Sequence, residues 1–320
     1  MNRLRIILIL LVALTVRPVL GQQQFVFTNY LLNQYYYNPA LAGSQNFHTA
    51  SLGYRNQWVG FEGSPVTMQA NFYGSYDNKK KHGYGASLMT DRSGLVQNTN
   101  IHLNYAYHIN LTDSIRLGFG IKPGFMQYNV KLYDAQLADP VDDVLTGNIL
   151  ATNALDLGSG LYIYSNKFFS AISMRHIMGK SISFTGFNYG LAKHFTFFGG
   201  YNYLTKSKKL EIQPSLLIQY VKPTPVQINM MLKATYNKKV WGGLIYRTKD
   251  AVGLVAGVNL WGRLSIGYGF DYSLGNVKSY NFGTHEIMIS FITTKNRPSL
   301  DQEDEDLNNG IFEENKKKNE

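Results

Sequence analysis

Apolar and polar residues alternate with a period of two along most of the chain, from about residue 48 to residue 292. In the clearest stretch, Val66, Met68 and Ala70 fall on one face, and the residues between them are polar. Several segments keep the alternation for about 10 residues, the length at which a tilted β-strand crosses the hydrocarbon core of a membrane. Strands of soluble sandwiches are shorter, about 5 to 6 residues. The pattern therefore predicts an all-β protein whose apolar faces contact lipid.

Fourteen such segments can be counted between short polar turns. An open sheet edge in lipid would leave backbone N–H and C=O groups without partners, so the sheet has to close. Bacterial single-chain barrels have an even number of strands. The sequence thus predicts a transmembrane outer-membrane β-barrel of about 14 antiparallel strands. The predicted strands are residues 48–58, 64–76, 82–90, 95–109, 114–128, 152–164, 168–176, 188–203, 210–220, 225–236, 239–247, 251–260, 263–273 and 282–292.

The connections between these strands differ in length on the two sides of the membrane. With the exported amino terminus in the periplasm, connections alternate between the outer and the periplasmic side. The longest connections, 130–151, 177–187 and 273–282, all fall on the outer side, and the periplasmic connections are short polar turns. This segregation is typical of outer-membrane barrels, and it supports the strand count independently of the period.

Residues 1–21 have the composition of a signal peptide. Arg3 and Arg5 precede the apolar run 6–16, and Val19-Leu20-Gly21 supplies a cleavage site. A spanning helix needs about 20 apolar residues, so this run is too short for a retained anchor. We therefore predict export through a cleaved signal peptide and integration into the cell outer membrane.

Two segments flank the predicted barrel. Residues 22–47 are rich in aromatic residues and Asn, and we expect them to pack in the lumen or on the barrel rim as a plug. The tail, residues 293–320, holds eight acidic and five basic residues, a charge of −3, and is expected to be disordered unless bound. Residues 22–292 carry +10, so the acidic tail and the basic barrel would attract each other.

The composition excludes several classes of site. The 320 residues include no cysteine, which rules out a disulfide scaffold, a thiolate zinc site, a cysteine nucleophile and a lipid-anchored lipoprotein. Charged residues make up 16% of the chain, against roughly 25% in ordinary soluble domains. This low charge, with 23 Tyr and 18 Phe, fits a barrel embedded in lipid.

Three segments carry a resemblance to a known family. Residues 37–44 read Tyr-Asn-Pro-Ala-Leu-Ala-Gly-Ser, residues 54–67 read Tyr-Arg-Asn-Gln-Trp-Val-Gly-Phe-Glu-Gly-Ser-Pro-Val-Thr, and residues 283–291 read Gly-Thr-His-Glu-Ile-Met-Ile-Ser-Phe. These segments resemble the PorP/SprF family, outer-membrane proteins of the type IX secretion and gliding machinery of Bacteroidetes. The resemblance implies a component that works with periplasmic ring and motor proteins. It also implies a role in bringing particular cargo, such as surface adhesins with a type B C-terminal sorting domain, to the cell surface.

The same segments supply the candidate contact residues for a plug or a partner. Asn38-Pro39 is a turn signal and Gly43 permits a positive φ, which favours a structured turn before the first strand, with a partner-docking edge as the alternative. The full set of candidate positions is Asn38, Pro39, Gly43, Tyr54, Arg55, Gln57, Trp58, Gly60, Gly63, Pro65, His285 and Glu286.

Two of these positions predict a structural latch. The alternation places Arg55 and Gln57 on the lumen side of the first strand. Glu286 lies on the last strand, which becomes the neighbour of the first when the barrel closes. An inward arginine usually pairs with a carboxylate or with the carbonyl groups of a plug, so Arg55 and Glu286 are expected to hold structure together and not to catalyse a reaction.

No motif points to a metal, a cofactor or an enzyme. His102 and His108 are six residues apart on one strand face, too far to share an ion without other ligands. An outer-membrane hydrolase with His176 and Ser181 at the outer rim is a third, weaker hypothesis, because nothing fixes a nucleophile beside its base. The basic residues are dispersed over turns, which argues against nucleic-acid binding and favours lipid phosphates or acidic partner surfaces.

The sequence therefore predicts a non-enzymatic outer-membrane component of the type IX secretion and gliding machinery, without a cofactor. It would bind periplasmic partners and assist the export or surface attachment of specific cargo. The alternative is a passive porin or small-solute transporter, in which residues 130–151 would form the narrowing loop.

Overall fold

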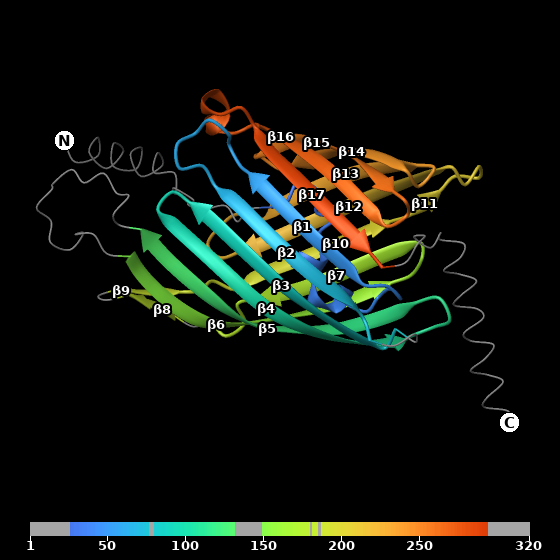
Figure 1. Cartoon of the computed structure of the whole chain (residues 1–320), viewed down its shortest axis with the longest axis horizontal. Helices are drawn as coiled ribbons and strands as arrows, with labels where there is room; N and C mark the ends of the chain where they lie inside the picture. The colour runs from blue at the N-terminus through green and yellow to red at the C-terminus, as the bar shows by residue number, and fades with distance from the viewer. Residues whose placement is uncertain (1–25, 77–79, 132–148, 180, 185–186, 294–320) are drawn as a thin grey trace, which may run out of the picture.

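The computed structural model describes residues 26–76, 80–131, 149–179, 181–184 and 187–293. The predicted signal peptide and almost all of the tail lie outside these residues. The described residues form one closed antiparallel barrel of fourteen strands tilted across its long axis (Figure 1). The barrel strands are β1 (Thr49–Asn56), β2 (Val66–Ser75), β3 (His82–Ser93), β4 (Val96–Asn110), β5 (Arg116–Lys131), β6 (Ile149–Tyr164), β7 (Phe168–Arg175), β10 (His194–Tyr201), β12 (Leu210–Val221), β13 (Gln227–Tyr236), β14 (Val240–Arg247), β15 (Ala251–Leu260), β16 (Leu264–Ser273) and β17 (Thr284–Ile292).

The ring closes where the first strand meets the last, and the pairing of β10 with β12 completes the series of consecutive neighbours. Strand β1 pairs with β17, with Arg55 directly opposite Glu286, and β10 pairs with β12 from His194 to Gly200. A two-residue strand, β11 (Tyr203–Leu204), continues β10 along β12. The predicted barrel of fourteen strands is therefore confirmed, and every barrel strand has two neighbours, as lipid requires.

One predicted strand was placed too early in the chain. Residues 188–203 were expected to form a single strand, but β9 (Phe187–Gly190) pairs with β8 (Ser181–Phe184) in a separate hairpin, and the barrel strand begins at His194. The alternation keeps the same phase through this region, so the period alone could not separate the two strands. A short connection favours local pairing of β8 with β9.

The two faces of the barrel follow the alternation. Apolar side chains such as Leu52, Leu103 and Leu244 are 59 to 65% exposed on the outer face, where lipid would cover them. Exposed aromatic residues lie near both ends of the strands, the arrangement of interfacial girdles: Tyr76, Tyr203, Tyr236 and Trp261 near one mouth, and Tyr220, Tyr246 and Tyr272 near the other. The inner face carries buried polar and charged side chains.

The connections assign the two mouths. The connections at residues 132–148, 176–193 and 274–283 are the longest in the sequence, and the strand ends that flank them all lie at one mouth, which we call the outer mouth. The other, inner mouth carries the turns 76–81, 111–115, 165–167, 205–209, 237–239 and 261–263. Short periplasmic turns are the rule in outer-membrane barrels, so the inner mouth faces the periplasm.

The helices of the described residues are short: α2 (Gln34–Tyr37), η1 (Pro39–Leu41) and η3 (Asn276–Tyr280). Within the described ranges, no helix has both the length and the apolar character to cross a membrane. The first two belong to residues 26–47, which lie inside the barrel and supply ten of the 21 buried residues in its main apolar cluster.

Placing a charge on the lipid face is the first test of this arrangement. Leu103 lies at the middle of β4 and is 65% exposed, so Leu103→Arg should lower the free energy of unfolding in lipid vesicles by about 2–4 kcal/mol. Reversible denaturant unfolding in vesicles measures the change. Leu111→Arg is the matched control, since Leu111 is also exposed but lies in an inner turn. Equal losses at both positions would contradict the placement of the lipid band.

Candidate functional site: a plugged lumen and its two mouths

Residues 26–47 form a plug inside the lumen. Phe27, Tyr36 and Tyr37 pack edge to face, with ring centroids 5.0 to 6.4 Å apart, and Tyr35 stacks on Tyr73 of β2 at 4.3 Å. Burial raises the pKa of the Tyr36 hydroxyl, which stays protonated and accepts a hydrogen bond from the Arg175 guanidinium at 2.5 Å. Residues 26–47 thus lie against the inner wall of the barrel with most of their side chains buried.

The first anchor of the plug is the predicted pair on β1 and β17. Arg55 Nη1 lies 3.2 Å from Glu286 Oε2, and both side chains are 1% exposed. The same carboxylate accepts hydrogen bonds from the plug backbone, from Thr28 N at 2.7 Å and from Asn29 N at 2.9 Å. Glu286 therefore joins the seam between the first and last strands to the beginning of the plug.

Two further charged residues extend this anchor around the wall. Asp271 of β16 lies 3.2 Å from the guanidinium groups of both Arg55 and Arg247, and its Oδ2 accepts a hydrogen bond from the Thr28 hydroxyl at 2.8 Å. Arg247 of β14 also donates to the Val26 carbonyl at 3.4 Å. Two buried cations and two buried anions thus hold residues 26–29. We call Arg55, Arg247, Asp271 and Glu286 the charge latch.

The second anchor lies on the opposite wall, at Asn38. Its Nδ2 donates to the Leu161 carbonyl of β6 at 2.8 Å and to the Ile172 carbonyl of β7 at 3.1 Å. Its Oδ1 accepts from Ala40 N at 2.8 Å and caps the 3-10 turn η1, in which Pro39 is the first residue. Asn38 is completely buried. The Asn-Pro pair therefore forms the expected turn, and the same asparagine also joins the plug to two strands.

Glycines on the wall, and one in the plug itself, allow this part of the plug to approach the strands closely. Gly43 has a φ of +82°, and a Cβ there would lie 2.6 Å from Gly83 Cα of β3. A Cβ on Gly120 would lie 2.3 Å from Ala40 N, and one on Gly160 would lie 2.3 Å from the Asn38 side chain. Only glycine allows so close an approach of backbones. These inward glycines form the seat of the η1 turn.

Five candidate residues lie together at the outer mouth, in the β1–β2 connection. This connection, residues 57–65, contains Gln57, Trp58, Gly60, Gly63 and Pro65. Gln57 N donates to the Pro65 carbonyl at 2.8 Å. Gly60 has a φ of +92° and packs against Phe282, while Val59 N donates to the Gly283 carbonyl at 2.8 Å.

The segment that resembles the family thus ties the outer end of β1 to the start of β17. Gln57 was expected in the lumen beside Arg55, but β1 ends at Asn56, so strand alternation no longer governs Gln57. Tyr54 and His285 lie on the lipid face, where the His285 Nδ1 and the Tyr268 hydroxyl are 2.6 Å apart.

A group of histidines lies in the lumen near the outer mouth. His102 Nε2 and His176 Nδ1 lie 2.9 and 3.0 Å from the two oxygens of Asp156. His108 is elsewhere, with its Nε2 at 2.7 Å from the Ala42 carbonyl of the plug. Among the described residues, no group of three or more potential ligands could hold a metal ion. The side chain of Ser181, the proposed nucleophile of the hydrolase hypothesis, lies outside the described residues.

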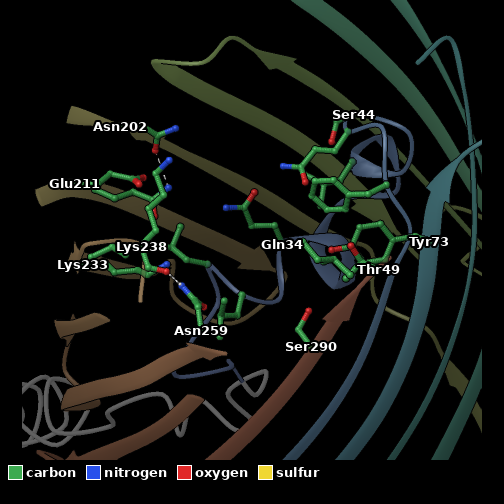
Figure 2. Close-up of a pocket in the computed structure, with 18 of the residues that line it drawn as sticks. Gln34, Ser44, Thr49, Tyr73, Asn202, Glu211, Lys233, Lys238, Asn259 and Ser290 are labelled. Carbon is green, nitrogen blue, oxygen red and sulfur yellow. Dashed lines mark hydrogen bonds between the residues drawn. The ribbon is translucent and has the colours of Figure 1, made fainter. Parts of the chain in front are cut away.

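A vestibule opens at the inner mouth, on the periplasmic side of the plug. Its volume is about 320 Å³. Figure 2 shows Asn202, Glu211, Lys233, Lys238 and Asn259 on one side, Ser44, Thr49 and Tyr73 on the other, and Gln34 of the plug between them. The charged residues of its lining are the lysines at 208, 209, 233 and 238 and the glutamate at 211, so the vestibule is basic.

The rim of this mouth is also basic. The described residues of its turns include one acidic residue, Asp113, and nine basic residues: Lys80, Lys81, Lys167, Lys206, Lys208, Lys209, Lys238, Lys239 and Arg263. Such an excess of one sign at the opening of a lumen focuses the potential and attracts negative partners.

Sequence reasoning missed several of these contacts. It did not connect Asp271 to Arg247 or to the plug, because these residues belong to different elements of the chain. The inward glycines on strands β3, β5 and β6 gave a usable signal, since glycine recurs where the alternation expects polar wall residues. The basic turns were recognised, but not the vestibule that three of their lysines and Lys233 help to frame.

The barrel, its lipid face and its filled lumen define an outer-membrane β-barrel closed by its own N-terminal segment. The sequence model of the family described as "Type IX secretion system membrane protein PorP/SprF" matches residues 19–291 of this chain. The chain therefore belongs to the PorP/SprF family of type IX secretion system membrane proteins. A comparison with curated protein sequences gave no match.

Solved structures of outer-membrane barrels are similar in fold. The CymD monoaromatic hydrocarbon channel aligns with a TM-score of 0.50 and 13% identity over 81% of this chain and 92% of that chain. A Pseudomonas aeruginosa FadL homologue aligns with a TM-score of 0.46 and 8% identity over 80% and 91%. Acinetobacter baumannii Omp33 gives 0.44 and 9% over 78% and 98%. The likeness to CymD shows the barrel fold alone.

Removal of one cation tests the charge latch. Arg55→Leu leaves Asp271 and Glu286 buried with less counter-charge, which should lower the free energy of unfolding by about 3–5 kcal/mol. Denaturant unfolding of the refolded barrel measures this loss. Arg263→Leu, at an exposed position in an inner turn, is the matched control and should have a much smaller effect. Losses of equal size would show that the latch contributes nothing specific.

Proposed function

We propose that this barrel is a non-enzymatic component of the type IX secretion and gliding machinery in the outer membrane. It binds periplasmic ring or motor proteins at its inner mouth and assists the export or surface attachment of specific cargo, such as adhesins with a type B C-terminal sorting domain. The family membership of residues 19–291 supports the assignment to the type IX secretion machinery. The filled lumen supports a role other than bulk solute passage.

The plug is the observation that carries this proposal. It is anchored at Glu286 on one wall and at Asn38 on the other, and most of its side chains between these points are buried. A passive porin needs a water-filled cross-section, and here the middle of the lumen is occupied by aromatic side chains. A barrel of this kind presents surfaces at its two mouths more readily than it conducts solutes.

The inner mouth suits a partner with an acidic surface. Its turns are short, and their described residues include nine basic ones. Complementary charge speeds association and selects partners more than it adds affinity. Periplasmic proteins with acidic docking faces, and anionic lipid head groups beside them, fit this chemistry.

Conductance separates this proposal from the porin alternative. The wild-type barrel in a planar bilayer should carry no large steady current. Glu286→Ala removes the acceptors of Thr28 N and Asn29 N, loosens the plug, and should raise the current severalfold. Asp113→Ala, in an inner turn, is the control and should leave the current unchanged.

A cysteine pair distinguishes a loosened plug from a damaged barrel. The chain has no cysteine, and the side chains of Asn33 and Asn71 are 3.5 Å apart, so Asn33→Cys with Asn71→Cys would tether the plug to β2. The oxidised pair should suppress the current of the Glu286→Ala barrel, and reduction should restore it. A large, ungated current through the wild type would favour the porin.

Partner binding is tested in cells that lack the gene. Deletion should abolish secretion or gliding and leave solute uptake normal. The wild-type gene should restore the lost secretion or gliding. Lys206→Glu with Lys239→Glu and Arg263→Glu reverses charge on the inner rim outside the vestibule and should restore little secretion. The matched control reverses three exposed basic residues of the outer mouth, Lys193, Lys222 and Lys278.

The opposite result is equally informative. Normal secretion with defective solute uptake in the deleted strain would overturn the proposal. Full restoration by the inner-rim variant would remove the basic rim from partner binding. Surface levels of the barrel, measured in every strain, ensure that a loss of secretion does not reflect a loss of protein.

A further inference from the structure

We infer that the vestibule at the inner mouth is a docking site for the acidic run of this chain's own tail, residues 301–306. The run reads Asp-Gln-Glu-Asp-Glu-Asp and carries five negative charges in six residues. This inference does not depend on which partner or cargo the barrel serves.

The last strand ends at the vestibule, and the tail follows it in the chain. Ile292, the end of β17, is 1% exposed and lines the vestibule together with Ser290. Thr293 is fixed beside it, because its N donates to the His48 carbonyl at 3.1 Å and its Oγ1 accepts from His48 N at 3.1 Å. The chain thus leaves the wall at the edge of the basic lumen.

Charge makes the vestibule complementary to the run. Its lining carries four lysines and one glutamate, and three of the lysines, Lys208, Lys209 and Lys238, are exposed at the opening. Lys233 lies deeper, with its Nζ 5.1 Å from the centre of the Trp241 ring. Carboxylates entering from the periplasm would meet the exposed lysines first and Lys233 below them. Partial enclosure weakens the screening of these pairs by salt.

The distance between the run and the strand suits this site. Eight residues, 293–300, separate Ile292 from Asp301, and a chain of this length spans at most about 26–29 Å. A segment on so short a tether reaches an effective concentration on the order of millimolar. Such a tether gives the tail an advantage over an acidic segment of another protein at low concentration. The family match ends at residue 291, so the run is a feature of this chain beyond that match.

Disulfide cross-linking tests the site in the full-length protein. The chain has no cysteine, so Leu307→Cys behind the run can be paired with Thr235→Cys in the vestibule lining. Lys249→Cys, in the turn between β14 and β15 at the outer mouth, is the position control. In the folded barrel, the tail should cross-link to position 235 at least about tenfold faster than to position 249.

Charge variants show whether the run itself is recognised. Neutralising it with Asp301→Asn, Glu303→Gln, Asp304→Asn, Glu305→Gln and Asp306→Asn should slow the cross-link about tenfold, and raising the salt from about 0.05 to 0.5 M should act in the same direction. Glu313→Gln, Glu314→Gln and Glu320→Gln neutralise the end of the tail and are the matched control, with a change below about twofold.

The lysines are tested in the same assay. Lys208→Gln with Lys209→Gln and Lys238→Gln should slow the cross-link as neutralisation of the run does, whereas Lys193→Gln with Lys222→Gln and Lys278→Gln should not. Heat-modifiable migration on gels confirms that each variant is folded. Equal cross-linking to positions 235 and 249, or no response to either set of charges, would overturn the inference and leave the vestibule to an acidic segment of another protein.

Discussion

A closed sheet of fourteen strands encloses more space than the side chains of its own wall can fill. Eight strands are about the size at which the side chains alone fill the interior. Here residues 26–47 occupy the remaining space in the middle of the lumen. A backbone that leaves water needs partners for its N–H and C=O groups, so the polar wall has to supply them. Glu286 accepts two N–H groups of the plug, and Ser173 donates to the Tyr37 carbonyl. The polar residues of the lumen thus serve the plug as well as water.

The charge latch couples this packing to the closure of the barrel. Arg55 and Glu286 face each other across the seam between the first and last strands, and Asp271 and Arg247 continue the network on β16 and β14. Buried charges are costly unless each is paired and hydrogen-bonded, so the four residues have all their partners only when these strands and the polar groups of residues 26–29 are in place. The latch therefore makes plug and seam mutually dependent. Asn38 and the glycine seat on β3 to β6 give the plug a fixed position on the far wall.

The sequence carried the parts of this structure that depend on local pattern. The alternation located the strands and their faces, and the even count fixed the neighbours of each strand, so the pair Arg55 and Glu286 could be named before any coordinates. The pattern could not show which of two similar segments pairs with which neighbour. The residues on both sides of 191–193 alternate in one phase, yet β9 belongs to a hairpin and β10 to the barrel. The contacts of Asp271 with Thr28 and Arg247 join residues far apart in the chain, which no periodicity reports.

Most of the inward and loop residues in the segments that resemble the family lie at three places in the structure. Asn38 and Gly43 seat the plug, Arg55 and Glu286 hold the seam, and Trp58 to Pro65 close the outer end of the same seam. These residues stabilise the closed barrel and order the outer end of its seam. The lysines of the basic inner mouth lie outside these motifs, on turns and strand ends elsewhere in the sequence. In this chain, the segments that resemble the family therefore build the closed barrel, and other parts of the sequence set the charge at its inner mouth.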